Sequence, residues 1–209
     1  MKKNDSLSEK LFDAIERNDL CRVISLINKG ACPNSPSAIS PFFRPLEFAL
    51  DEMEFECSLD VVKALIKAGA DVNAWNIPKS TRPIHHAVFT LNYDCILLLL
   101  ENDADPNCVS DTGHLPLTYV VDAGEVGLAE LLIQFGADKT MHDCHFAPPY
   151  NALNHAVKNV DVDMVKLLLN SGADPQFLDI DGYCASHYLP KINGDNKNAH
   201  KLILDMLSR

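Results

Sequence analysis

The sequence predicts an all-α repeat solenoid, and three observations support this fold class. A string built around glycine, alanine and aspartate recurs five times, with its third position at Gly30, Gly69, Asp103, Gly136 and Gly172. A second string recurs in phase with the first, at 45–49, 83–87, 116–120, 152–156 and, in a worn copy, 185–189. Apolar runs of helical length precede most copies of the first string. A spacing of 33 to 39 residues is typical of stacked repeats that share one continuous core.

The residue types in both strings fit helix ends. Proline loses no needed hydrogen bond in the first turn of a helix, so the second string predicts helix starts at Pro45, Pro83 and Pro116. Runs such as 164–169 predict helices buried between neighbours. Glycine after such a run predicts a left-handed helix end. Asp103, which replaces that glycine in one copy, predicts some loss of local stability.

The two strings resemble the ankyrin repeat family, whose unit of about 33 residues opens with Thr-Pro-Leu-His-x-Ala and contains a β-turn and two antiparallel helices. The resemblance covers about residues 7–207 and implies helix-turn-helix units joined by β-hairpin loops within a single domain, 1–209. Six units are expected, at 7–34, 45–73, 83–107, 116–140, 152–176 and 185–207. The first and last depart from the pattern, as expected of caps with one face in water.

The composition of the chain argues against several classes of protein. Hydrophobic residues at 47% and charged residues at 22% are typical of a globular chain. The apolar stretches are far shorter than the roughly 20 residues that cross a bilayer, and no secretory signal opens the chain, so we expect a cytoplasmic protein without a membrane span. Seven cysteines without a close Cys-x-x-Cys pair predict reduced thiols. The net charge of −11 argues against a nucleic-acid partner, because phosphate binding needs a basic patch.

Three segments depart from the regular repeat. About four extra residues lie between the helices of the second unit, within the acidic stretch 51–58. The loops 35–44 and 141–150 are long and carry prolines and aromatic residues. The family resemblance implies that such loop tips contact partners. A plain longer turn, or a loop folded back onto its neighbour, is the alternative.

One column of residues is predicted to face the concave side, directly before the conserved alanine of each inner helix. This column contains Asp13, Phe48, His86, Tyr119, His155 and Tyr188. A row of rings suggests a binding site, because aromatic side chains supply large rigid contact areas. The alternative is that some rings pack against the adjacent hairpin.

A second column lies three residues further along and contains Glu16, Asp51, Phe89, Asp122, Lys158 and Lys191. It predicts a groove that is acidic towards the N-terminus and mildly basic towards the C-terminus, suited to a partner segment that is basic and apolar. Trp75 is the only tryptophan and is either an anchor for the partner or a cover for a repeat seam. The candidate partner-binding residues are Phe48, Asp51, Trp75, His86, Phe89, Tyr119, Asp122, His155 and Tyr188.

The sequence shows no motif for catalysis or cofactor binding. His85 and His187 occupy the family's histidine position, which implies a structural role through backbone hydrogen bonds. The run His142-Asp143-Cys144-His145 has ligand-type side chains, but adjacent residues do not converge on one ion as a tetrahedral zinc site requires. We therefore expect no enzyme activity, cofactor or metal. A small enzyme or metal-binding protein that uses the 142–146 hairpin is the alternative of another class.

Two asparagines invite a second interpretation. Asn73 and Asn107 each follow a leucine by eight residues, Leu65 and Leu99, and in animal members of the family such asparagines resemble substrates of an asparaginyl hydroxylase. A hydrogen bond within the hairpin is the structural alternative.

These features predict a protein–protein interaction module, acting as an adaptor, inhibitor or scaffold through its concave groove and hairpin tips. A secreted pathogen effector that acts on a host protein, in the host cytoplasm, is the alternative, since the family resemblance covers both kinds. We expect a monomer, because capping repeats close both ends.

Overall fold

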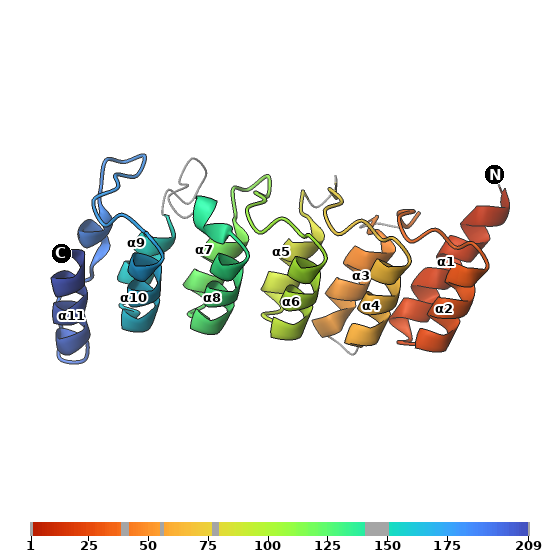
Figure 1. The fold of residues 1–209 in the computed structure, drawn as a ribbon, viewed down its shortest axis with the longest axis horizontal. Coiled ribbons are helices and arrows are strands. Elements are labelled where there is room, and N and C mark those ends of the chain that lie inside the picture. The colour runs from red at the N-terminus through yellow and green to blue at the C-terminus, as the bar shows by residue number, and fades with distance from the viewer. Residues whose placement is uncertain (1, 39–41, 55–56, 77–79, 141–150, 209) are drawn as a thin grey trace. The chain divides into compact units, whose positions relative to one another are not determined.

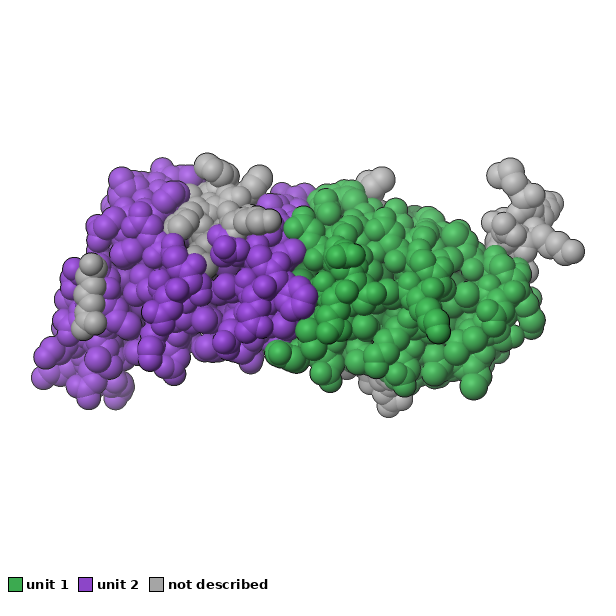
Figure 2. Space-filling model, viewed as in Figure 1, with its two compact units in different colours: residues 1–105 green, residues 106–209 purple. Residues whose placement is uncertain are grey.

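The structure is a computed structural model that describes residues 2–38, 42–54, 57–76, 80–140 and 151–208 (Figure 1). The regular secondary structure of these residues is helical, apart from one isolated antiparallel bridge between Asn76 and Thr81. The chain divides into two compact units, residues 1–105 and 106–209 (Figure 2). The helical prediction is confirmed.

The first unit contains three helix pairs in succession (Figure 1). The pairs are α1 (Lys2–Glu16) with α2 (Leu20–Asn28), α3 (Pro45–Asp51) with α4 (Leu59–Lys67), and α5 (Pro83–Phe89) with α6 (Tyr93–Glu101). The first helix of each pair, here called the inner helix, packs on the inner helix of the next pair, and the second helices pack on one another likewise. The extra residues of the second pair form a short 3-10 helix, η1 (Glu52–Glu54).

The second unit continues the pattern but ends differently. Its described elements are α7 (Pro116–Asp122), α8 (Val126–Gln134), η2 (Ala137–Thr140), α9 (Ala152–Lys158), α10 (Val162–Asn170), η3 (Ala185–Tyr188) and α11 (Lys197–Leu207). Helix α7 packs on α9, and α8 packs on α10. In the last repeat the four-residue 3-10 helix η3 replaces the inner α-helix, as its worn sequence allows.

The core lies where the helix pairs stack. The predicted apolar runs supply it: Val61, Leu65, Ile96, Leu99, Leu132 and Leu168 have no exposed surface. The inner helices contribute Ile84, Leu117 and Leu153. Among the described residues, no helix has the length and hydropathy that a membrane span requires.

The inner helices begin as the sequence predicts. Pro45, Pro83 and Pro116 each occupy the first turn. The side chain two residues later accepts a hydrogen bond from the backbone N–H just before the proline: Arg44 donates to Glu47 at 2.9 Å and Arg82 to His85 Nδ1 at 3.0 Å. This bond satisfies an amide that the first helical turn leaves unpaired. The structural role predicted for His85 is therefore confirmed.

The helix ends use left-handed residues. Gly30, Gly69, Gly136 and Gly172 have φ between 88° and 98°, and Asp103 adopts 67° in the equivalent place. A second left-handed residue lies in the turn between the two helices of four of the five pairs, the pair α3 and α4 excepted among the described residues. It is Asn18, Leu91, Gly124 and Val160 in turn, with φ between 51° and 76°.

Side-chain amides link successive repeats within each unit. Asn34 Nδ2 donates to the carbonyl of Gly69 at 2.8 Å, and Asn34 Oδ1 accepts from the N–H of Asp71 at 2.8 Å. Asn73 makes the same two bonds one repeat later, to Asp103 at 2.7 Å and from Asp105 at 2.9 Å. We call this arrangement the asparagine clamp.

Candidate protein-binding surface

The ring column predicted from the sequence lies on the inner helices and η3, and its side chains are largely covered. Phe48, Tyr119 and Tyr188 are half-buried. His86 and His155 are buried, with 7% and 8% of their surface exposed. The structure therefore shows a packing role for these rings, and their role as partner contacts stays a prediction.

His86 is fixed from both sides of its ring. Its Nδ1 lies 3.6 Å from Asp51 Oδ1, on the inner helix of the preceding repeat, and its Nε2 lies 3.1 Å from Thr81 Oγ1. Phe43 packs edge-on against the ring at 5.2 Å between centroids. The ring is thus held in one orientation, while Asp51 remains exposed beside it.

Phe89 is an exposed ring on an inner helix of the first unit. Its centroid lies 6.5 Å from that of His86, and 45% of the residue is exposed. Phe48 instead packs edge-on against Phe12, with 5.5 Å between centroids. Asp51, His86 and Phe89 therefore form one continuous surface, which we call the unit 1 patch.

Carboxylates border the unit 1 patch. Asp51 and Glu16 are both exposed. Partial burial, followed by the charges of Glu16 and Asp51, raises the pKa of Glu52. Glu16 and Asp51 therefore lie close enough to Glu52 for their charges to act on it. The acidic character predicted for this part of the inner surface is present within the first unit.

The second unit repeats the histidine–aspartate pairing. His155 Nδ1 lies 3.1 Å from Asp122 Oδ1 on the preceding inner helix. Burial lowers the pKa of His155, and the hydrogen bond that its ring donates to Asp122 opposes that change without cancelling it. Asn159 Nδ2 donates to the backbone carbonyl of Asp122 at 3.3 Å. The aspartate itself stays exposed.

Two tyrosines near the last repeat donate hydrogen bonds to Asp179. Tyr188 donates its hydroxyl to the buried Asp179 carboxylate. Burial raises the pKa of Asp179, but hydrogen bonds from Tyr188 and from the Tyr183 and Asp181 N–H groups outweigh it and lower the pKa. His187 was predicted to bond to the backbone; its exposed ring instead stacks on Tyr183, with 3.7 Å between centroids. The difference follows from the four-residue η3, which replaces the helix that a family histidine caps.

The second unit contributes three charged residues to the second column, and the groove gradient that they were expected to form stays a prediction. Asp122 lies at the end of α7, whereas Lys158 ends α9 and Lys191 follows η3. All three residues are exposed. The acidic and basic ends of this column are therefore present among the described residues of the unit.

Trp75 lies in the loop between α4 and α5, with 37% of its surface exposed. Its backbone carbonyl accepts a hydrogen bond from Arg44 Nη1 at 2.8 Å. The guanidinium carbon of Arg82 lies 6.0 Å from the ring centroid, within the range of a cation–π contact. The ring therefore both packs at a repeat seam and remains accessible.

The histidine–cysteine hairpin, residues 142–146, lies outside the described residues. Among the residues that the structure does describe, no group of three or more His, Cys, Asp or Glu side chains is placed to hold a metal ion. Burial raises the pKa of Cys57 to about 11 and that of Cys95 to about 12, so these thiols stay protonated and unreactive.

Several contacts were not predicted from the sequence. Arg44 and Phe43 reach Trp75 and His86 across more than 30 residues of sequence, and no local pattern marks such pairs. A signal for the asparagine clamp was present, because Asn34 occupies the same position as Asn73. The alternative for Asn73 was a hydrogen bond within the hairpin; its side chain does form hydrogen bonds, but they join it to the backbone of the following repeat.

Comparison with known proteins identifies the family. A family model described as ankyrin repeats (3 copies) matches residues 49–143 and 84–179, which together cover more than half of the chain. The chain belongs to the ankyrin repeat family. Ankyrin repeats are generally protein–protein interaction modules, and most members are not enzymes.

Individual relatives match parts of the chain. Neurogenic locus notch homolog protein 1 of Danio rerio is 32% identical over 71% of this chain. Ankyrin repeat protein nuc-2 of Neurospora crassa is 26% identical over 62% of it. BTB/POZ domain and ankyrin repeat-containing protein NBCL of Lotus japonicus is 42% identical over 54% of it.

The matches cover less than a quarter of each of these three relatives. They span 6% of the notch homolog, 15% of nuc-2 and 22% of NBCL. The similarity therefore concerns the repeat region, and the activities of the whole relatives do not follow from it.

Proposed function

We propose that the chain binds a protein partner through its inner surface, and that the unit 1 patch takes a segment in which an apolar side chain lies next to a basic one. The observation that carries this proposal is the exposed ring of Phe89 beside the Asp51 carboxylate, joined through the buried ring of His86. Aromatic side chains contribute strongly to binding because they bury a large area at low entropic cost. The nearby carboxylates orient a basic segment and speed its encounter.

The chain acts, on this proposal, as an adaptor, inhibitor or scaffold in the cytoplasm. Within the second unit, the exposed residues Asp122, Lys158 and Lys191 carry both signs of charge. A monomer is proposed as the working form, and light scattering coupled to size-exclusion chromatography measures its mass directly.

The test compares matched surface variants in affinity capture from a lysate of the cells that make the protein. Phe89→Ala removes the exposed ring of the patch, whereas Tyr93→Ala removes an equally exposed ring, at 49%, on the outer helix α6. We expect a set of proteins that the wild type and Tyr93→Ala retain and Phe89→Ala loses. Capture that is unchanged in Phe89→Ala, or lost equally from both variants, contradicts the proposal.

Charge reversal tests the second half of the proposal. Asp51→Lys is expected to weaken the same partner, since it places a like charge against the basic segment. Circular dichroism checks that each variant is folded. A partner that binds Asp51→Lys more tightly is acidic and overturns the proposed chemistry.

A further inference from the structure

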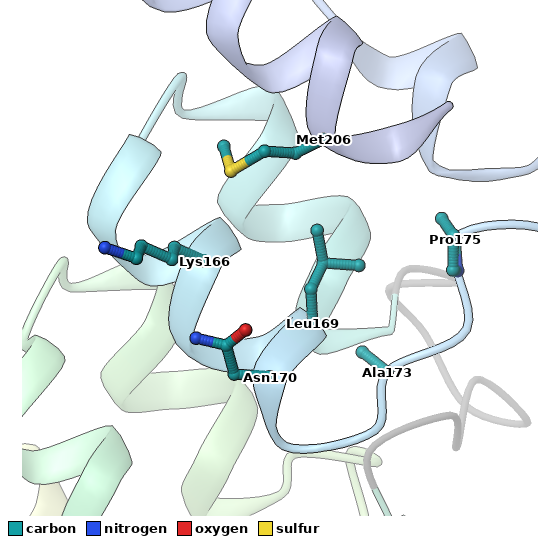
Figure 3. Close-up of a pocket in the computed structure, with 6 residues that line it drawn as sticks. All are labelled: Lys166, Leu169, Asn170, Ala173, Pro175 and Met206. Carbon is teal, nitrogen blue, oxygen red and sulfur yellow. The ribbon is translucent and has the colours of Figure 1, made fainter. Parts of the chain in front are cut away.

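An open cleft lies between α10, the loop after it and α11, on the outer helices of the second unit (Figure 3). Its volume is about 420 Å³, and it is lined by Lys166, Leu169, Asn170, Ala173, Pro175 and Met206. Positions 166, 169 and 170 lie on one face of α10, and Ala173 and Pro175 lie in the loop after it. The cleft is therefore one side of α10, continued into its loop and faced by Met206 from α11.

The cleft exists because α11 covers α10 incompletely. The last repeat lacks a full inner helix, and α11 buries only Ile203 and Leu207. Leu202 lies one helical turn before Met206, on the same side of α11, and is 53% exposed. The apolar surface thus extends from the cleft along α11.

The lining defines the chemistry of an occupant. Leu169, Ala173, Pro175 and Met206 give apolar walls, and a methionine side chain adapts readily to the shape of a ligand. Lys166 is exposed and supplies an ammonium group. None of the six lining residues carries a carboxylate. Lys166 is the charged residue among those that line the cleft, while the exposed Asp174 and Asp205 are sequence neighbours of lining residues, so an apolar group with a negative charge placed at Lys166 complements the cleft.

The charge of Lys166 is not used within the described part of the chain. Lys63 holds the equivalent position on α4 and lies 3.5 Å from Asp60, one turn earlier. Lys166 has Asp163 at the same spacing, yet no carboxylate of the described residues lies within ion-pair distance of it. Its ammonium group thus remains available to a partner.

We propose that this cleft is a second binding site, which takes a short acidic segment of a protein partner with an aliphatic side chain in the cleft and a carboxylate on Lys166. The volume lies in the range of known ligand sites. The open side of the cleft leaves room for the backbone of a peptide. The site differs from the unit 1 patch in position and in the charge that it accepts, so its fate is independent of the proposed function.

Binding to the cleft can be followed by nuclear magnetic resonance, because Leu169, Ala173 and Met206 all have methyl groups whose signals respond to a bound ligand. The probe is the capped peptide acetyl-Asp-Asp-Leu-Leu-Asp-Asp-amide, with acetyl-Lys-Lys-Leu-Leu-Lys-Lys-amide as the charge control. We expect the acidic peptide to shift these three methyl signals and the basic peptide to leave them unchanged. Equal shifts with both peptides, or shifts confined to the inner helices, overturn the proposal.

Surface variants give the matched control. Lys166→Glu is expected to weaken the acidic peptide at least about fivefold, because it removes an exposed ion pair worth up to about that factor and adds a repulsion, and Lys166→Arg is expected to retain the peptide. Lys63→Glu should bind as the wild type does. If Lys166→Glu and Lys63→Glu both lose binding of the acidic peptide, the effect is one of overall charge, and a local site is contradicted. Hexanoate that produces the same shifts at the same concentration as the peptide identifies a small carboxylate as the ligand and also contradicts the proposal.

Discussion

At the scale of single residues, the environment sets which side chains are chemically available. Cys32 is exposed, and its pKa is lowered by a hydrogen bond from the Ser35 side chain and by the Asn34 backbone. Cys57 and Cys95 are buried, with pKa values raised to about 11 and about 12. Thiols of one chain thus differ widely in reactivity.

Alkylation of the native protein should separate these cysteines. With iodoacetamide at pH 8, we expect Cys32 to react quickly and Cys57 and Cys95 to stay unmodified, because the thiolate is the reactive form. Mass spectrometry of tryptic peptides measures each site. Ser35→Ala should slow Cys32 by removing the bond that stabilises its thiolate. Rapid labelling of Cys95 without urea would show that the core opens readily.

His155 should make stability depend on pH. Burial, opposed by Asp122, lowers its pKa in the folded state, so the unfolded chain binds the proton more readily. The stabilising effect is complete above the unfolded value of about 6.5 and declines as pH falls below it. Between pH 7.5 and 5.5, the free energy of unfolding should therefore fall more in the wild type than in His155→Gln.

Urea titrations at both pH values measure this difference, and Asp122 provides the control. Asp122→Asn removes the group that raises the pKa of His155, so the loss at low pH should become larger than in the wild type. Equal pH dependence in the wild type and His155→Gln would show that His155 is protonated without cost.

At the scale of helices and turns, the repeats depend on left-handed residues that are not always glycine. Val160 joins α9 to α10 with φ 58°, although a branched side chain makes this conformation unfavourable. Gly124 holds the same place between α7 and α8 with φ 76°. Val160→Gly and Gly124→Val therefore exchange the same two residue types in opposite directions at equivalent turns.

Val160→Gly should raise the free energy of unfolding by about 0.5 to 1 kcal/mol. It relieves about 1 to 2 kcal/mol of backbone strain in the folded state, but glycine also increases the conformational entropy of the unfolded chain, which offsets part of this gain. Gly124→Val should lower the free energy of unfolding by about 1 to 2 kcal/mol for the same reason. Urea midpoints at 25 °C test both. A stabilised Gly124→Val would show that the turn relaxes around any residue.

The asparagine clamp joins neighbouring elements through side-chain amides. Asn73→Ala should lower the free energy of unfolding by about 1 to 3 kcal/mol, since it leaves the carbonyl of Asp103 and the N–H of Asp105 without their partner. Asn73→Asp retains an acceptor but loses the donor, so it should also destabilise. Asn198→Ala, on the exposed side of α11, is the control and should change stability by less than about 0.5 kcal/mol. Equal stability of all three variants would show that water replaces the clamp.

At the scale of the whole molecule, the net charge is −11, and few of the charged residues form ion pairs among the described residues. Four pairs are present in the described ranges, and two of them involve histidine. Repulsion between carboxylates such as Glu16, Asp51 and Glu52 opposes the compact state.

Salt should therefore stabilise the protein. Raising sodium chloride from 0.02 to 0.3 M is expected to increase the free energy of unfolding by about 0.5 to 1 kcal/mol, because it screens exposed like charges. Urea titrations at the two concentrations test this, and Glu52→Gln should reduce the effect. A loss of stability with salt would mean that attractive pairs dominate the surface.

The sequence predicted the helix pairs but only part of the surface. Helix starts at Pro45 and Pro83 follow from local chemistry, because proline and the capping side chain act within one turn. The burial of His86 does not, since it depends on Asp51 and Phe43, which come from other elements. The cleft of the last repeat depends on how α11 packs after η3, and no residue pattern encodes that packing.

The asparagine clamp has a consequence for how such a chain can lengthen. Asn34 and Asn73 bind only backbone groups of the following repeat, and every repeat offers a carbonyl and an N–H at that place. A duplicated unit therefore meets its neighbour's amide without any compensating mutation. The asparagine clamp does not depend on the side chains of the following repeat. Copies of a repeat can therefore be inserted or removed while the surface residues of each repeat change.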